Sequence, residues 1–172
     1  MDTFPICGYH LKPGQFSSHI LSVLSSGGDL FILDKPLYYF SQAGELFQIP
    51  HGAQSDGISA PKCAAALGRT AGGNDWAAGW FHDAAYRNTL QIWVPTLVGR
   101  ESSRASSTNQ PEPSTQNPQP STGQWQLAKL SKAQSDAYLR ECALACGDSS
   151  IEAETLYLAV AAFGRSSFNA DR

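Results

Sequence analysis

The residues best suited to acid–base chemistry lie together at positions 80–88, which have the sequence Trp-Phe-His-Asp-Ala-Ala-Tyr-Arg-Asn. The alanines favour a helix, and on a helix His82 and Tyr86 share one face while Asp83 is rotated by about 100° from His82. An imidazole has an ordinary pKa of about 6.5, which suits a general base at physiological pH. The sequence therefore predicts His82 as a general base with Tyr86 beside it.

A catalytic histidine also needs an acceptor that orients its other ring nitrogen, and Asp83 cannot reach that nitrogen from the next position of the same helix. The candidate acceptor is Asp136, which lies in a second predicted helix. The long connection between the two helices permits them to pack antiparallel, which would bring Asp136 to His82. The same contact could instead be a hydrogen bond that only joins two helices, so a structural role for the pair stays open.

The remaining polar residues near His82 suggest how a ligand could be held. Asp83 would be available for a cation or a substrate. Asp56, in a Ser-Asp-Gly turn, could supply a second oxygen ligand beside Asp83, or it could be an Asx-turn residue that closes the loop. Trp80 and Arg87, which flank His82 in the same segment, are the candidate substrate-binding residues.

Short strands are expected before this segment. Runs of aromatic and aliphatic residues, separated by proline and glycine, predict β-strands at 30–33, 37–40 and 46–49. Because proline removes a donor from the ladder, Pro36 and Pro50 must lie at strand ends. Strands of this length, separated by such short turns, are expected to pair antiparallel.

Helices are expected in the rest of the ordered chain. Apolar residues spaced three and four apart predict helices at 76–90, 127–147 and 151–164. The sequence therefore predicts an α+β fold, in which short antiparallel strands in the N-terminal third pack on two or three helices that carry His82 and Asp136. We expect residues 1–172 to form a single domain.

One segment, residues 99–124, differs from its surroundings. It contains no valine, isoleucine, leucine, methionine or aromatic residue and consists mostly of serine, proline, threonine, glutamine and asparagine. Such a segment cannot bury enough apolar surface to offset the entropy lost on ordering. We expect a disordered loop inserted within the domain.

The composition excludes several classes of protein. The chain has 172 residues, with 12 Lys+Arg against 15 Asp+Glu and a net charge of −3, which gives no basic surface for nucleic acid. No apolar run approaches the roughly 20 residues that span a bilayer. The N-terminus lacks a basic region followed by an apolar stretch, so we expect no secretory signal and a cytoplasmic protein.

The four cysteines, Cys7, Cys63, Cys142 and Cys146, are too few and too scattered for a disulfide framework. Cys142 and Cys146 are one helical turn apart, but the second pair that a zinc site needs is missing. We expect buried structural thiols, because a free cysteine packs as a small apolar side chain.

Several motifs in order resemble one family. Phe-Gln-Ile-Pro-His-Gly-Ala-Gln-Ser-Asp-Gly-Ile-Ser-Ala-Pro at 47–61 and Trp-Ala-Ala-Gly-Trp-Phe-His-Asp-Ala-Ala-Tyr at 76–86 precede Ser-Asp-Ala-Tyr at 135–138 and Tyr-Leu-Ala-Val-Ala-Ala-Phe-Gly at 157–164. This order resembles the domain of unknown function 1353 family of phages and bacteria. The resemblance covers nearly all of residues 30–164 except the polar insertion, but it implies no activity.

A shorter resemblance implies a chemistry. His-Asp-Ala-Ala-Tyr-Arg-Asn, beginning at His82, is similar to the active-site helix of phospholipases A2, above all the bacterial and fungal type. The resemblance implies that His82 activates water, that Asp83 ligates a calcium ion and that Asp136 orients His82 with support from Tyr86. Calcium would polarise an ester carbonyl and stabilise its oxyanion.

The chain also departs from the phospholipase pattern. Ala78, Gly79 and Ala85 stand where cysteines often bracket the helix in those enzymes. Residues 62–66, at the place of the glycine-rich calcium loop, contain no glycine.

The favoured function is thus a hydrolase that uses a water activated by His82 and Asp136, with a cation possible at Asp83. The resemblance to phospholipases A2 implies that its substrate is a small-molecule or lipid ester. One alternative uses the same pair as a general acid and base on a small metabolite, in an isomerase, lyase or cyclase. A second is a non-catalytic, phage-derived interaction domain. A third is a metal-dependent HD phosphohydrolase, whose order of ligands His51, His82, Asp83 and Asp136 satisfy formally. The oligomeric state does not follow from these residues.

Overall fold

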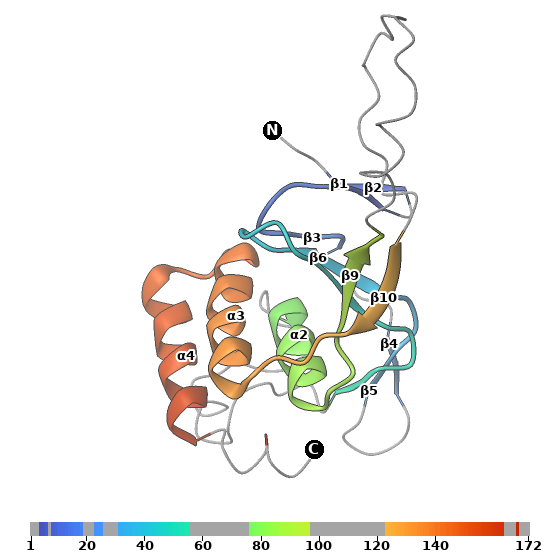
Figure 1. The fold of residues 1–172 in the computed structure, drawn as a ribbon. Helices are drawn as coiled ribbons and strands as arrows, with labels where there is room; N and C mark the ends of the chain where they lie inside the picture. The colour runs from blue at the N-terminus through green and yellow to red at the C-terminus, as the bar shows by residue number, and fades with distance from the viewer. Residues whose placement is uncertain are drawn as a thin grey trace, which may run out of the picture.

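The computed structural model describes residues 4–6, 8–18, 23–25, 31–55, 76–96, 123–163 and 168. Strands occupy one part of this fold, and three helices lie side by side in the other (Figure 1). Helix α4 (Ser150–Phe163) contacts α3 (Lys132–Ala145), and α3 contacts α2 (Trp76–Tyr86). Helix α2 in turn contacts the strands β7 (Leu46–Ile49) and β8 (Gln54–Ser55). The predicted α+β class is therefore confirmed.

The strands are short and all pair antiparallel in three sheets. The central sheet has the order β10-β9-β7-β6-β3, a second has the order β4-β5-β8, and β1 pairs with β2. The bounds are β1 Phe4–Ile6, β2 Tyr9–Leu11, β3 Gln15–Phe16, β4 Val23–Ser25, β5 Phe31–Leu33, β6 Leu37–Phe40, β7 Leu46–Ile49, β8 Gln54–Ser55, β9 Gln91–Pro95 and β10 Gly123–Leu127.

The hairpin β6–β7 forms the middle of the central sheet. Its turn contains Gly44 with a φ of 86°, a conformation that glycine adopts without steric cost. Tyr39 pairs with Phe47 across the hairpin, and the rings of both residues make edge contacts with Phe81 of α2. These aromatic contacts fix α2 against the sheet.

Contrary to the prediction, the strands are not confined to the N-terminal third. Strands β9 and β10 come from the middle of the chain and complete the central sheet, with Trp93 opposite Trp125. Gly123 and Gln124 belong to β10 and not to a loop, so the expected disordered segment is too long at its C-terminal end. The remainder of that segment lies outside the described residues. The second part of the motif at 47–61, residues 56–61, also lies outside them.

Three helices carry the candidate site: α2 (Trp76–Tyr86), α3 (Lys132–Ala145) and α4 (Ser150–Phe163). Helix α2 ends before its predicted end at residue 90 because Asn88 has a φ of 57°, in the left-handed region that asparagine tolerates. The chain then enters β9.

Helix α3 begins five residues later than predicted, because Leu127 belongs to β10 and Ser131 is the N-cap of α3. Ser131 and Gln134 form a reciprocal capping box. At the other end, Gly147 has a φ of 96°, and the N–H groups of Gly147 and Asp148 donate to the carbonyls of Leu144 and Ala143. This Schellman arrangement confirms the predicted glycine stop.

The buried face of α3 includes two polar residues. Ala137 is exposed, whereas Ser135, Asp136 and Leu139 are buried together with Cys142. A carboxylate on a buried helix face requires compensating partners.

Candidate active site

Helix α2 brings His82 and Tyr86 to α3 because it lies between the sheet and α3 and is buried on nearly every side. Small residues such as Ala78, Ala84 and Ala85 allow its neighbours to approach closely. The rings of His82 and Tyr86 lie on one face of α2, with centroids 4.0 Å apart, as their spacing predicts.

The predicted partner of His82 is confirmed. The Nε2 atom of His82 lies 3.1 Å from Oδ1 of Asp136, and the two side chains are 3% and 2% exposed. The hydroxyl of Tyr86 donates to the same Oδ1 at 2.5 Å. An ionised carboxylate only accepts hydrogen bonds, so Nε2 carries the proton and Nδ1 is the basic nitrogen of neutral His82.

Lys132 is a member of this cluster that the sequence analysis missed. Its Nζ atom lies 2.5 Å from Oδ2 of Asp136 and also donates to the carbonyls of Val160 and Ala161 in α4, at 3.0 and 3.3 Å. Lys132 and Asp136 are four residues apart on α3. That spacing could have suggested the pair, but it is also typical of exposed helix surfaces.

These contacts keep Asp136 ionised. Burial raises the pKa of the Asp136 carboxyl, but the hydrogen bonds from His82, Lys132 and Tyr86 lower it, and the resulting pKa lies below its ordinary value. Burial and the hydrogen bond to Asp136 raise the pKa of the Tyr86 phenol, so Tyr86 remains a donor. The cluster is therefore a buried carboxylate with three donors drawn from α2 and α3.

Asp83 points away from Asp136, as the helical spacing predicts. The hydroxyl of Ser55, at the end of β8, donates to Oδ2 of Asp83. Asp56, the other predicted cation ligand, lies outside the described residues. Within the described ranges, no group of three or more His, Cys, Asp or Glu residues could hold a metal ion. Of the two predicted cation ligands, the structure therefore describes only Asp83.

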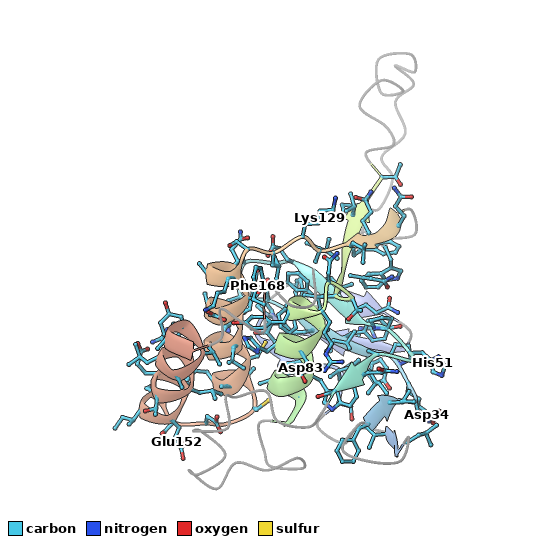
Figure 2. All side chains as sticks on the ribbon, turned by 90° about the horizontal axis from the view of Figure 1, so that it is seen from below. Asp34, His51, Asp83, Lys129, Glu152 and Phe168 are labelled. Atoms are coloured by element: carbon cyan, nitrogen blue, oxygen red, sulfur yellow. The ribbon has the colours of Figure 1, made fainter. Side chains whose placement is uncertain are left out.

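The other candidate residues are dispersed. Trp80 is 1% exposed and lies in the core, and its Nε1 atom has no hydrogen-bond partner among the described residues. Arg87 is half-buried, one residue beyond α2. His51 is exposed and lies far from Asp83 in Figure 2, so the four residues expected for an HD phosphohydrolase are not gathered at one place.

An aromatic residue near the C-terminus covers part of the cluster. The ring of Phe168 makes an edge contact with the ring of Tyr86, with centroids 5.2 Å apart, and Figure 2 shows Phe168 close to α2. The ring of Tyr86 in turn lies against the imidazole of His82.

The described thiols agree with their predicted role. Cys142 is buried and Cys146 is half-buried. Burial raises the pKa of the Cys142 thiol well above its ordinary value. Cys7 and Cys63 lie outside the described residues. No helix of the described ranges is long and apolar enough to cross a membrane.

The fold and the site define an α+β domain whose helices enclose an ionised aspartate bound by histidine, tyrosine and lysine. The chain belongs to the family described as "Protein of unknown function (DUF1353)", whose model matches residues 31–160. This match confirms the family that the ordered motifs indicated. A search of curated proteins and a search of solved structures each found no match. The similarity to phospholipases A2 stays a prediction.

Proposed function

We propose that this protein is an ester hydrolase in which His82, oriented by Asp136, removes a proton from water. The observation that carries the proposal is the hydrogen bond between Nε2 of His82 and Oδ1 of Asp136. The carboxylate selects the tautomer with a basic Nδ1 and would stabilise the imidazolium that forms when water is deprotonated. The activated water would attack the ester carbonyl, and His82 would return the proton to the departing alkoxide.

The energetics of the cluster support a chemical role. Burying a carboxylate costs several kcal/mol before its partners compensate, and replacing such buried ionic groups with apolar residues of similar volume is often neutral or stabilising. Apolar residues could therefore join α2 to α3 at least as well as His82 and Asp136. Perturbed pKa values gathered in one cluster are also typical of catalytic sites.

The substrate class rests on sequence similarity. The residues from His82 to Asn88 resemble the active-site helix of phospholipases A2, which hydrolyse lipid esters. Asp83 has a hydrogen bond from Ser55 and is only half-buried, so its carboxylate could face a substrate or a cation. The proposed proton transfers run between His82, water and the ester oxygen and involve no metal ion.

The burial of His82 favours a second candidate, in which the His82–Asp136 bond only joins two helices in an interaction domain. At 3% exposure, the imidazole meets water only if the structure around it opens. The two candidates make opposite predictions for stability and activity, so one pair of variants separates them.

The decisive experiment compares the wild-type protein with His82→Gln and with His51→Gln, a change at an exposed histidine outside the cluster. Hydrolysis would be measured on p-nitrophenyl esters of short and long acyl chains and on phosphatidylcholine vesicles. We expect His82→Gln to reduce kcat by at least about 100-fold, since general-base catalysis contributes roughly that much, and His51→Gln to retain full activity. Absence of wild-type hydrolysis on every ester, with a large loss of stability in His82→Gln, would instead support the structural role.

A further inference from the structure

The position of Lys132 is unexpected for helix stability. It is the first residue of α3, directly after the N-cap Ser131, and the first turn contains no acidic residue. The N-terminus of a helix carries a positive partial charge, so a lysine there is unfavourable. The helix dipole therefore does not explain why a cation stands at this position.

The contacts of the Lys132 side chain do explain it. The ammonium group donates to Asp136 Oδ2 and to the carbonyls of Val160 and Ala161. These two carbonyls lie in the last turn of α4, where helix carbonyls lack intrahelical partners and carry a negative partial charge. The three donors of an ammonium group thus meet three acceptors, two from α4 and one from the carboxylate.

The two oxygens of the Asp136 carboxylate accept hydrogen bonds from different partners. Oδ2 accepts from Lys132, while Oδ1 accepts from His82 and Tyr86. A carboxylate held at only one oxygen can rotate about its Cβ–Cγ bond. With Oδ2 held by an ammonium that α4 itself fixes, that rotation is restricted and Oδ1 stays directed at the imidazole.

We propose that Lys132 is a positioning residue for the dyad: it fixes the Asp136 carboxylate against the end of α4, so that Oδ1 holds the His82 ring in one orientation. This inference rests on the proposed function for its catalytic consequence. The orientation of His82 itself is a property of the folded protein and can be measured without a substrate.

The test compares Lys132→Met, Lys132→Arg and Arg140→Met. Methionine fills the same space without the charge, and arginine keeps a cation. Arg140→Met is the matched control, because Arg140 also joins α3 to α4 through an ion pair with Glu154 at 2.5 Å, but away from the dyad, with the two side chains 47% and 44% exposed.

In the kinetic arm, we expect Lys132→Met to lower kcat on the ester cleaved by the wild type by at least about tenfold, with KM nearly unchanged. Misplacing a catalytic group by about 1 Å can cost on the order of 100-fold in rate. Lys132→Arg should recover part of the loss, and Arg140→Met should not change kcat. Equal kcat values for Lys132→Met and the wild type would overturn the proposal, as would equal losses in Lys132→Met and Arg140→Met.

The second arm is proton NMR of the His82 Nε2–H at a fixed pH, assigned by its absence in His82→Gln. We expect a downfield, exchange-protected resonance in the wild type and in Arg140→Met, and a shifted or broadened one in Lys132→Met. An unchanged resonance in Lys132→Met would overturn the positioning role. Because this arm needs no substrate, the resonance would support or refute the role of Lys132 even in a protein whose lack of esterase activity had refuted the proposed function.

Discussion

Replacing Asp136 with asparagine tests the centre of the cluster. Asparagine has nearly the same shape as aspartate, so the change removes the charge and leaves the packing. His82 and Tyr86 would then bond a neutral amide, and the Lys132 ammonium would lose its only carboxylate partner in the described structure. A hydrogen bond to a charged group contributes more than one between neutral groups, by roughly 1 kcal/mol.

The size of the effect follows from burial. Removing one member of a buried ion pair costs about 3–5 kcal/mol, because the other charge remains uncompensated. The Lys132 side chain is 18% exposed and keeps two carbonyl acceptors in α4, so we expect the lower end of that range, about 3 kcal/mol. Urea unfolding of wild type and Asp136→Asn at neutral pH would measure it.

The matched control is Glu154→Gln, which removes the carboxylate of an exposed pair between α3 and α4. Exposed pairs contribute below about 1 kcal/mol, so this variant should unfold at nearly the wild-type urea concentration. A loss of stability in Asp136→Asn no larger than that in Glu154→Gln would refute the reasoning that the buried cluster holds the three helices together.

The same variant has a pH signature. The pKa of the Asp136 carboxyl is lower in the folded protein than its ordinary value of about 3.9, so the folded state binds fewer protons at this group. Its contribution to stability is therefore complete above the unfolded pKa and is lost as the pH falls through the lower, folded pKa. The difference in unfolding free energy between wild type and Asp136→Asn should shrink across that acidic window. A constant difference would contradict the lowered pKa.

Three further predictions follow from burial and hydrogen bonding. Tyr86→Phe keeps the ring but loses the bond to Asp136, so it should cost about 1.5–3 kcal/mol in urea unfolding; no loss would argue against that bond. Diethyl pyrocarbonate, followed by peptide mass spectrometry, should modify exposed His51 at least about tenfold faster than buried His82, and equal rates would show that the site is open. Iodoacetamide at about pH 8 should leave Cys142 unmodified until the protein unfolds, because burial raises its thiol pKa, while half-buried Cys146 reacts sooner.

The part of the site that follows from local periodicity could be predicted from the sequence. A spacing of four places His82 and Tyr86 on one face of α2 whatever the rest of the fold does. The pairing of His82 with Asp136 also followed, because the histidine required an acceptor and the second helix offered Asp136. These contacts depend on helix geometry and on a single tertiary approach.

The features that could not be predicted from the sequence depend on the surroundings of each element. Strand β10 alternates polar and apolar residues at the end of a polar segment, and only its pairing with β9 makes Trp125 part of a sheet. Burial of the polar residues Ser135 and Asp136 on α3 could not be predicted from hydropathy. The buried carboxylate of Asp136 depends on Lys132, one helical turn away, and on donors from α2, which no pattern within α3 reveals.

The contacts of Lys132 bear on whether the buried cluster has a structural or a catalytic role. The Arg140–Glu154 pair shows that α3 and α4 can be joined at the surface without burying a charge. The chain nevertheless buries a carboxylate, gives its two oxygens to different partners, and uses the end of α4 to hold the cation. A requirement for a fixed, ionised group beside an imidazole would account for all three features, because apolar contacts would supply the same cohesion without the desolvation cost. The proposed general base would impose such a requirement.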